Sequence, residues 1–357
     1  MPTPTIYDIA EQARVSIATV SRVLNGSPRV SEATRERVFD VARQLGYQPN
    51  ASAQNLARQN TRVVAAVVPA MTSPFYMEVL RGVQDRLDAS DYDLVVYTSR
   101  TLDKVDGALG RAVRRGTSDG LLLLSTPVTE ARAELLHAAG PVVLVDVAHD
   151  AFDAVAVDNR RGGAEAIRHL AARGHARIGV VLPDRDSVPA QERLAGARDE
   201  LAARGLEADD RLVVWADWDH NQHGYTRNAG YLGMQTLLER FADDPAGAPT
   251  AVFVAADVLA LGALRAAREA GLDATSTAFD MVGFDDIASS AYVGLTTMRQ
   301  PMAEMGTHAA ERLLRRLAEP DLSPAHTVYA PTLVVRETTG AARVPAEASA
   351  PPLAEVA

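Results

Sequence analysis

The sequence has no cysteine in 357 residues and no apolar run of the roughly 18 residues that a membrane span requires. The first absence excludes disulfide frameworks, thiolate metal sites and cysteine nucleophiles, and it permits a reducing compartment. Near the start of the chain, Asp8, Glu11 and Arg14 stand where a secretory signal needs an apolar segment. We therefore expect a cytoplasmic protein.

Basic charge is also scarce. The whole chain carries a net charge of −10, which taken alone argues against a nucleic-acid partner. Residues 1–60, however, hold seven Arg and five Asp or Glu, a net charge of +2, so the remaining residues carry −12. A short basic head before an acidic body fits a head that approaches phosphate and a body that phosphate repels. An excess of two positive charges does not establish DNA binding by itself.

Signatures of catalysis and of cofactor binding are missing as well. The chain has no GxxxxGK[ST] phosphate-binding loop, and its eight His are scattered. Residues 116–120 (GTSDG) satisfy the GxSxG pattern of hydrolases, but that motif needs a strand before the Ser and a helix after it, whereas here the order is reversed. His220 and His223 lack a convincing third metal ligand. We expect neither an enzyme, nor a metal site, nor a cofactor.

The first 45 residues predict three short helices. Apolar residues recur at helical spacing in TIYDIAEQA after an N-terminal capping pattern, so a helix should begin at Ile6. A second helix, capped by Ser16, should begin at Ile17, and a third, capped by Ser31, at Glu32. A turn of three residues separates the first two. The pattern is typical of a helix-turn-helix domain.

The second of these helices leaves a face outside that suits a reader of DNA bases. Its later apolar residues face the core, so Ile17, Ala18 and Arg22 point outward. In the major groove an Arg can bond guanine O6 and N7, and small apolar groups can meet thymine methyl groups. The alternative is a generic three-helix bundle whose exposed Arg is only solvated.

The run TIYDIAEQARVSIATVSRVLNGSPRVSEATRERVFDVARQLGYQPNASAQNLA resembles the DNA-binding head and hinge of the LacI/GalR family of bacterial regulators, and the resemblance continues to about residue 340. By that resemblance, Ile17, Ala18 and Arg22 read bases. It also implies that a set of polar side chains holds the phosphates: Thr5, Tyr7, Ser16, Thr19, Ser21 and Asn25.

A hinge is expected at residues 46–60. Its stretch NASAQNLAR is too short and too polar to persist as a helix alone in water. In the family, two such segments fold together in the minor groove and wedge a Leu into a base step, which kinks the duplex. Leu56 matches that Leu, and Asn50 and Gln54 match backbone or groove contacts. Many relatives carry Ala-Arg in place of Gln54-Asn55, so Leu56 is the firmer match. A flexible linker is the alternative.

After residue 60 the chain alternates apolar runs with amphipathic helical stretches. Continuous apolar strands separated by helices indicate parallel sheets buried on both faces. The predicted fold is an all-α three-helix head followed by a two-lobed, periplasmic-binding-protein-like α/β core. We expect the head at 1–45, the hinge at 46–60, the first lobe at about 61–168 and 299–325, the second lobe at about 169–298 and 326–340, and a disordered tail at 341–357.

Polar side chains follow many of these strands. Ligands of such folds bind beyond the carboxyl ends of the strands. Carboxylates that accept two hydroxyls, an Arg and aromatic faces make a set suited to a polyol or a sugar, although acids at these positions also commonly cap helices. The set comprises Ser73, Phe75, Ser125, Asp146, Asp158, Arg193, Asp217, Trp218, Asp257 and Asp285.

The family resemblance extends to this core, in segments such as VDNRRGGAEAIRHLAARGHARIGVV and MVGFDDIASSAYVGLTTMRQPMAEMG. It implies that Asp158, Arg193, Trp218 and Asp285 contact an effector and that Phe75 lines the opposite wall. Ser73, Ser125 and Asp257 join the predicted site by their positions after strands.

Two departures from the family pattern bear on the ligand. Ala256 stands where many sugar-responsive relatives have an Asn, and residues 219–229 (DHNQHGYTRNA) read as an insertion.

We expect a regulator that acts by repression, binds a roughly palindromic operator as a homodimer and responds to a sugar. Two alternatives are a response to a nucleoside or purine and a solute-binding protein of a transporter; the latter is disfavoured by the head and by the lack of an export signal. Induction is the commoner mode in the family. The tail has no leucine heptad, so no coiled-coil tetramer is expected.

Overall fold

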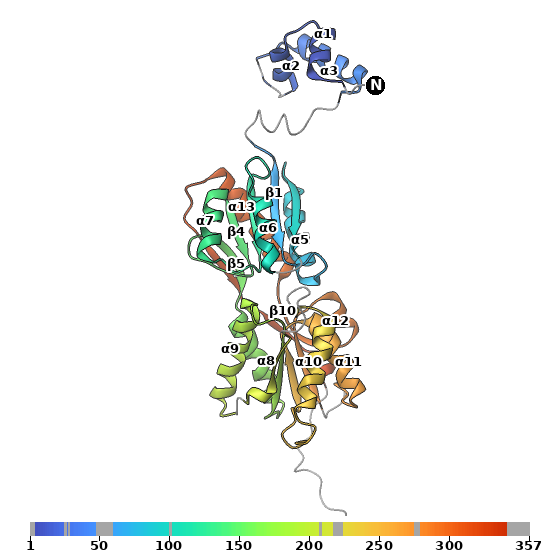
Figure 1. Ribbon diagram of the computed structural model, residues 1–357, viewed down its shortest axis with the longest axis vertical. Helices are drawn as coiled ribbons and strands as arrows, with labels where there is room; N and C mark the ends of the chain where they lie inside the picture. The colour runs from blue at the N-terminus through green and yellow to red at the C-terminus, as the bar shows by residue number, and fades with distance from the viewer. Residues whose placement is uncertain are drawn as a thin grey trace, which may run out of the picture.

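The structure is a computed structural model that describes residues 4–24, 27, 29–47, 60–99, 102–206, 209–216, 224–274 and 279–340 (Figure 1). Several residues singled out from the sequence lie outside these ranges, together with most of the hinge and the whole tail. They are Asn25, Asn50, Gln54, Leu56, Asp217, Trp218, His220 and His223.

The head consists of α1 (Ile6–Gln12), α2 (Ile17–Leu24) and α3 (Glu32–Leu45), with the starts that the sequence predicted. The Asp8 carboxylate accepts a hydrogen bond of 2.7 Å from the Thr5 amide and so caps α1. The three helices enclose a small core of their own. Its buried members are Ile9, Ala10, Ala13, Val20, Val23, Val38 and Ala42.

The turn between α1 and α2 passes through a left-handed residue. Arg14 has φ of +53° and an exposed side chain. The Val15 amide donates to the Ala10 carbonyl at 3.0 Å, which closes α1. A left-handed conformation at this position therefore sets the direction in which α2 leaves the turn.

The first lobe of the core is built on a parallel sheet whose strand order is β11-β5-β4-β3-β1-β2. Helices cover both of its faces, as expected because its four central strands, β5, β4, β3 and β1, are buried almost throughout. The strands are β1 (Val63–Val68), β2 (Asp93–Thr98), β3 (Gly120–Leu124), β4 (Val142–Val145), β5 (Asp153–Val157) and β11 (His326–Tyr329). The helices are α5 (Pro74–Leu87), α6 (Leu102–Ala112), α7 (Glu130–Ala139) and α13 (Met302–Ala318).

The second lobe repeats this plan with the order β12-β10-β9-β8-β6-β7, in which only β12 runs antiparallel to its neighbour. The strands are β6 (Ile178–Leu182), β7 (Val213–Trp215), β8 (Ala251–Val254), β9 (Asp280–Asp285), β10 (Thr296–Arg299) and β12 (Thr332–Val334). The helices are α8 (Asn159–Ala172), α9 (Val188–Ala203), α10 (Arg227–Glu239), α11 (Asp257–Glu269) and α12 (Ala288–Tyr292), with short 3₁₀ turns η1 (Asp210–Leu212) and η3 (Glu337–Thr339).

The chain passes between the lobes three times, and two of the lobe limits differ from the prediction. Helix α8 packs against α9 and against strands of the second lobe, so residues 159–168 belong there rather than to the first lobe. Strand β11 pairs with β5, so residues 326–329 belong to the first lobe. Apolar periodicity could not reveal this because it shows that a strand exists, not which sheet the strand joins.

Three helix pairs, α5 with α13, α8 with α9 and α10 with α11, pack closely enough that only glycine fits at the crossings. A Cβ on Gly163 would lie 2.0 Å from the Arg193 carbonyl oxygen, and one on Gly196 would lie 1.7 Å from that of Arg160. The same reciprocal arrangement occurs at Gly82 and Gly306 and at Gly230 and Gly262. Because backbone packs directly against backbone at these crossings, the two helices of each pair have little room to shift relative to each other.

No helix in the described part of the chain is both long enough and apolar enough to cross a membrane.

Candidate functional site

Helix α2 presents the face that the sequence assigned to base reading. Val20 and Val23 are fully buried in the head, whereas Ile17, Ala18 and Arg22 are exposed, Ile17 by 39%. An isoleucine this open on a helix of eight residues contributes little to the head's own core. The exposed edge of α2 therefore carries two apolar side chains, Ile17 and Ala18, and the guanidinium of Arg22. This guanidinium forms no ion pair with any described residue.

The predicted phosphate contacts surround this edge. Tyr7 is 66% exposed, and Thr5 and Ser16 are exposed too, while Thr19 and Ser21 are half-buried. The Ser16 and Thr19 hydroxyls share a hydrogen bond of 2.9 Å, which holds both at the start of α2. Hydroxyl groups fixed beside an exposed helix N-terminus suit the oxygens of a phosphate backbone.

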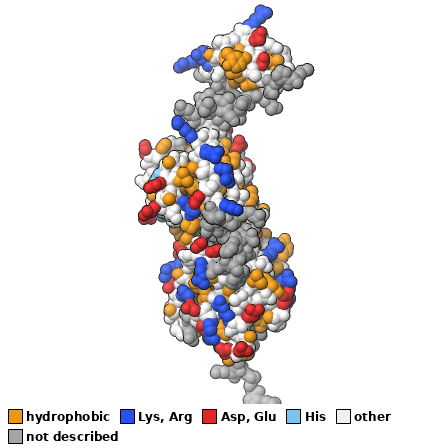
Figure 2. Space-filling view, in the orientation of Figure 1, with side chains coloured by type: hydrophobic (Ala, Val, Ile, Leu, Met, Phe, Trp, Pro, Cys, Tyr) orange, Lys and Arg blue, Asp and Glu red, His pale blue; other side chains and the backbone are white. Residues whose placement is uncertain are grey.

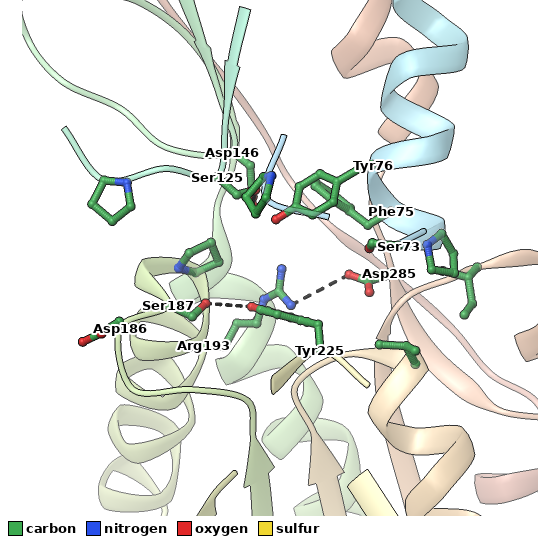
Figure 3. A pocket seen from close by; sticks show the side chains of 16 residues that line it. Ser73, Phe75, Tyr76, Ser125, Asp146, Asp186, Ser187, Arg193, Tyr225 and Asp285 are labelled. Atoms are coloured by element: carbon green, nitrogen blue, oxygen red, sulfur yellow. Dashed lines mark hydrogen bonds and ion pairs between the residues drawn. The ribbon is translucent and has the colours of Figure 1, made fainter. Parts of the chain in front are cut away.

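A second candidate site is a cleft of about 660 Å³, open to solvent, where the two lobes face each other. Figure 3 shows aromatic and acidic side chains of the first lobe opposite polar side chains of the second. The first lobe contributes Ser73, Phe75, Tyr76, Ser125 and Asp146, and the second contributes Asp186, Ser187, Arg193, Tyr225 and Asp285.

Arg193 of α9 lies at the centre of the cleft floor and is only 2% exposed. Its Nε donates to Asn159 Oδ1 at 2.8 Å and its Nη1 donates to the Ala255 carbonyl at 2.5 Å. The guanidinium carbon lies 3.7 Å from the centre of the Phe284 ring, which is a cation–π contact. These contacts hold the fork in one orientation, with Nη1 3.8 Å from Asp285 Oδ1.

Asp285, at the end of β9, is buried beside Arg193. Gln300 Nε2 donates to its Oδ1 at 2.6 Å. Burial raises the pKa of Asp285 well above its ordinary value, and the nearby Arg193 charge offsets only part of that effect. Its φ of +120° is a conformation that a residue with a side chain rarely adopts. The burial of its charge and its backbone conformation are both unfavourable for Asp285, and the residue lines the cleft, where a ligand can contact it.

Asp146, just after β4, is the corresponding carboxylate of the first lobe. Ser125 Oγ donates to its Oδ2 at 2.7 Å. Its Oδ1 is buried and has no hydrogen-bond partner among the described residues. Burial raises the pKa of Asp146 to about 6. A buried carboxylate oxygen without a donor is unfavourable, and a ligand hydroxyl would satisfy it.

Aromatic rings form the walls of the cleft. Phe75 and Tyr76, in the first turn of α5, pack edge to face with ring centres 5.2 Å apart. Tyr225, opposite, shares a hydrogen bond of 2.7 Å with the Ser187 hydroxyl at the start of α9. Burial raises the pKa of Tyr225 to about 12, so this phenol stays protonated at neutral pH and can donate a hydrogen bond.

Of the candidate residues listed from the sequence that lie within the described ranges, six line the cleft: Ser73, Phe75, Ser125, Asp146, Arg193 and Asp285. Asp158 and Asp257 do not. Asp158 caps α8 by accepting from the Arg161 amide at 2.9 Å. Asp257 is fully buried and accepts from the Ile287 amide and from two hydroxyls behind the cleft, those of Ser290 and Thr297. A structural role therefore explains the carboxylate in each case: Asp158 caps a helix, and Asp257 accepts hydrogen bonds from the segments behind the cleft.

Three residues that make contacts in the cleft were not assigned from the sequence. Tyr76 reads as an ordinary apolar residue of a helix, and Ser187 as an ordinary cap. Tyr225 lies in the segment 219–229 that was read as an insertion, and α10 begins within that segment, at Arg227 after the cap Thr226.

Comparisons with known proteins agree for the two parts of the chain. Residues 5–50 match the family model of bacterial regulatory proteins, lacI family, and residues 167–339 match that of a periplasmic binding protein-like domain. The HTH-type transcriptional regulator GalR of Escherichia coli (strain K12) is 34% identical over 340 residues, which cover 94% of this chain and 95% of GalR. The regulator CelR of Thermobifida fusca is 34% identical over 347 residues, which cover 94% and 98%.

Solved structures show the same similarity. A complex of the transcriptional regulator CelR with cellobiose superposes with a TM-score of 0.68 at 33% identity and covers 94% of this chain and 99% of its own. A lac repressor dimer bound to operator and the anti-inducer ONPF superposes with a TM-score of 0.78 at 28% identity and covers 95% and 99%.

Proposed function

Because the chain belongs to the lacI family of bacterial regulatory proteins, we propose that it represses transcription from a specific operator and that a sugar bound between its lobes sets its affinity for that operator. The chain is a DNA-binding transcription regulator with a helix-turn-helix head and a two-lobed core. The observation that carries the proposal is the presence, on one chain, of the exposed α2 edge and of a cleft in which Asp146 Oδ1 is buried without a hydrogen-bond donor among the described residues.

In the proposed DNA complex, α2 enters the major groove. Arg22 bonds a guanine edge, and Ile17 and Ala18 contact thymine methyl groups. The phosphate contacts are those of Thr5, Tyr7, Ser16, Thr19 and Ser21, with Asn25, Asn50 and Gln54 assigned by the family resemblance. Leu56 is assigned as the minor-groove wedge on the same basis.

In the proposed effector complex, Asp146 and Asp285 accept hydrogen bonds from ligand hydroxyls and Arg193 donates to a ring or hydroxyl oxygen. Phe75, Tyr76 and Tyr225 supply apolar faces for the ring. Trp218 joins them by the family resemblance. Two carboxylates, one on each lobe, allow a polyhydroxylated ligand to connect the lobes.

The solved relatives support a sugar. CelR is described in complex with cellobiose, and a LacI family regulator of Enterococcus faecium with bound ribose. A nucleoside is the second candidate because Phe75 and Tyr225 could also stack on a base. A solute-binding protein of a transporter is disfavoured because the function of such a protein does not involve DNA, whereas this chain carries a DNA-binding head.

Operator control follows from lobe closure in a homodimer. The dimer places two heads on a roughly palindromic site, as in the lac repressor dimer bound to operator. An effector that binds one lobe arrangement more tightly shifts the population toward it, and the heads then gain or lose operator affinity by the same coupling free energy.

The first experiment is a thermal-shift screen of the full-length protein against monosaccharides, disaccharides and nucleosides. We expect stabilisation by one group of sugars, and loss of that stabilisation in Asp285→Ala. A shift with nucleosides alone would replace the sugar by the second candidate. No shift by any sugar at millimolar concentration would refute the proposal for the cleft.

The second experiment selects DNA sequences from a random pool. The wild type should enrich one palindrome-like site, whereas Arg22→Ala should lose preference at one base pair in each half-site, worth about 1–3 kcal/mol. Arg29→Ala, which removes the same charge from another exposed position of the head, should keep the preference. Equal preference in Arg22→Ala and wild type would remove Arg22 from base reading.

A further inference from the structure

The edge of the first lobe where the chain arrives from the head is held by one acidic residue, Asp119. Its carboxylate accepts from the Thr61 amide at 2.7 Å, from the Thr61 hydroxyl at 2.8 Å and from the Arg62 amide at 2.8 Å. Asp119 ends the loop that joins α6 to β3. This loop and the end of the hinge segment are therefore neighbours in space.

The last turn of α6 and the same loop carry a group of arginines, Arg111, Arg114 and Arg115, which we name the edge arginines. All three are exposed, and none forms an ion pair with any described residue. Other arginines of this lobe are occupied, such as Arg62, paired with Asp91, and Arg132, paired with Asp106. Three uncompensated positive charges on a core that is acidic overall therefore concentrate beside the hinge.

The surface here is hollowed. A cavity of about 680 Å³, open to solvent, lies between the ends of α6 and α7, and Arg114 and Arg115 line it together with residues without bulk, among them Gly116, Ala138 and Ala139. Figure 2 shows Lys and Arg side chains gathered over the middle of the first lobe, with most Asp and Glu at its margins. A concave basic surface of this kind fits a convex anionic partner.

Chain connectivity limits how far the DNA can lie from this surface. Thirteen peptide steps join Tyr47, at the end of the head, to Asn60, at the edge of the core, and they span at most roughly 45 Å. The operator held by the head must pass within that reach of Asp119. DNA extends about 34 Å per helical turn, a length similar to the reach of this linker. An operator longer than one half-site is therefore long enough for its backbone to reach the edge arginines.

We propose that the edge arginines form a second DNA contact, in which Arg114 and Arg115 bind phosphates of the operator backbone next to the site of hinge binding. The inference rests on the proposed operator binding. Charge complementarity, the lack of an ion pair between the edge arginines and any described carboxylate, and continuity with the end of the hinge segment favour the DNA backbone over any other anion. The contact carries no base specificity because guanidinium groups on phosphates do not read sequence.

The test compares two double variants of the full-length protein. Arg114→Gln with Arg115→Gln removes two charges from the edge. Arg227→Gln with Arg268→Gln removes two exposed charges from the second lobe, where neither side chain pairs with a described residue. Affinity for the selected operator and for a scrambled duplex is measured from about 50 to 200 mM salt, the range in which phosphate contacts dominate.

We expect the edge variant to bind both duplexes about tenfold more weakly near 0.1 M salt, with a slope of log K against log salt shallower by between about 1 and 4 for the dimer. The control variant should match the wild type, and both variants should keep the thermal shift given by the effector. A slope equal to that of the control overturns the inference. Failure of the wild type to prefer any sequence would instead refute operator binding itself, so the two failures are distinguishable.

Discussion

Asp146 combines two roles that conflict in the unliganded protein. Its carboxylate is buried, has one hydroxyl donor and leaves one oxygen unsatisfied, and its φ of +65° is left-handed. Ligand binding supplies the missing donor. Asn is the informative replacement, because it is isosteric, tolerates the left-handed region as well as Asp does and cannot ionise.

Asp146→Asn should stabilise the unliganded core at neutral pH. Burial raises the pKa of Asp146 from its ordinary value to about 6, so below about pH 4 both states are protonated and wild type and variant should be equally stable. As the pH rises from about 4 to about 6, the wild type loses roughly 3 kcal/mol, at about 1.4 kcal/mol per pKa unit, and above about pH 6 the loss is complete, whereas the variant loses none. Urea unfolding from pH 4 to 8 measures the difference.

A difference between Asp146→Asn and wild type that did not change with pH would contradict this assignment. Asp243→Asn, which makes the same replacement at an exposed position, is the control for the general effect of removing one negative charge. The same titration repeated with saturating effector should reduce the gap, because the ligand then donates to the ionised carboxylate.

Arg14 is a second residue whose backbone is strained. A left-handed conformation costs a residue with a side chain roughly 1–2 kcal/mol, and glycine avoids that cost while losing about 0.5–1 kcal/mol of unfolded-state entropy. Arg14→Gly should therefore stabilise the head by about 0.5–1 kcal/mol. Amide hydrogen exchange of α1 and α2 in the full-length protein should slow by severalfold. Arg37→Gly, in the middle of α3, should instead accelerate exchange.

Sequence reasoning pointed to single residues of the cleft where chemistry was paired with position. Asp285 was predicted because it follows a strand, and Arg193 because it lies one turn into a helix and matches the family pattern; both line the cleft. Asp158 and Asp257 obey the same rule but are used as a cap and as a buried acceptor. The distinction depends on which way each side chain turns, and that is a tertiary property.

At the scale of elements, the reciprocal glycines explain how the cleft floor stays in place. Arg193 belongs to the helix whose Gly196 touches the backbone of α8, and the Arg193 carbonyl itself contacts Gly163. The floor of the cleft is thus positioned by backbone against backbone rather than by adaptable side chains. A change at these glycines should propagate directly to the guanidinium.

Gly196→Ala should destabilise the second lobe by about 1–3 kcal/mol or more, because the new Cβ would lie 1.7 Å from the Arg160 carbonyl oxygen. It should also weaken effector binding by displacing Arg193. Gly110→Ala in α6, where a Cβ meets nothing within 4 Å, should gain about 0.5–1 kcal/mol instead. Heat unfolding with and without effector separates the two variants, and similar melting temperatures would contradict the packing argument.

The individual elements were predictable and their assembly was not. The head helices begin at Ile6, Ile17 and Glu32 as expected, because caps and periodicity are local signals. The assignment of α8 and β11 to their lobes failed because it depends on contacts between distant segments.

For the whole molecule, the head and the core should act as separable units. Among the described residues, the hydrophobic core of the head extends to Tyr47, and the clusters of the core begin at Val64. Removing residues 1–60 should therefore leave effector binding within about twofold, as measured by the thermal shift, and abolish DNA binding. A truncated protein that still selected one DNA sequence would contradict the assignment of the reader to the head.

Because the chain passes between the lobes three times, parts of the first lobe are separated by most of the second lobe during synthesis. Strand β5 acquires its partner β11 only near the end of the described chain, and the buried Asp153 finds its donors late, from Arg312, Arg316 and the Ala325 amide 172 residues further on. At roughly 5–20 residues per second, the ribosome needs about 10–30 s to cover that distance. Throughout this interval the nascent first lobe has an open sheet edge and an unpaired buried acid, although the head is already complete. The first lobe is begun early and is completed only after most of the second lobe has been made, so its open sheet edge needs protection by chaperones for longest.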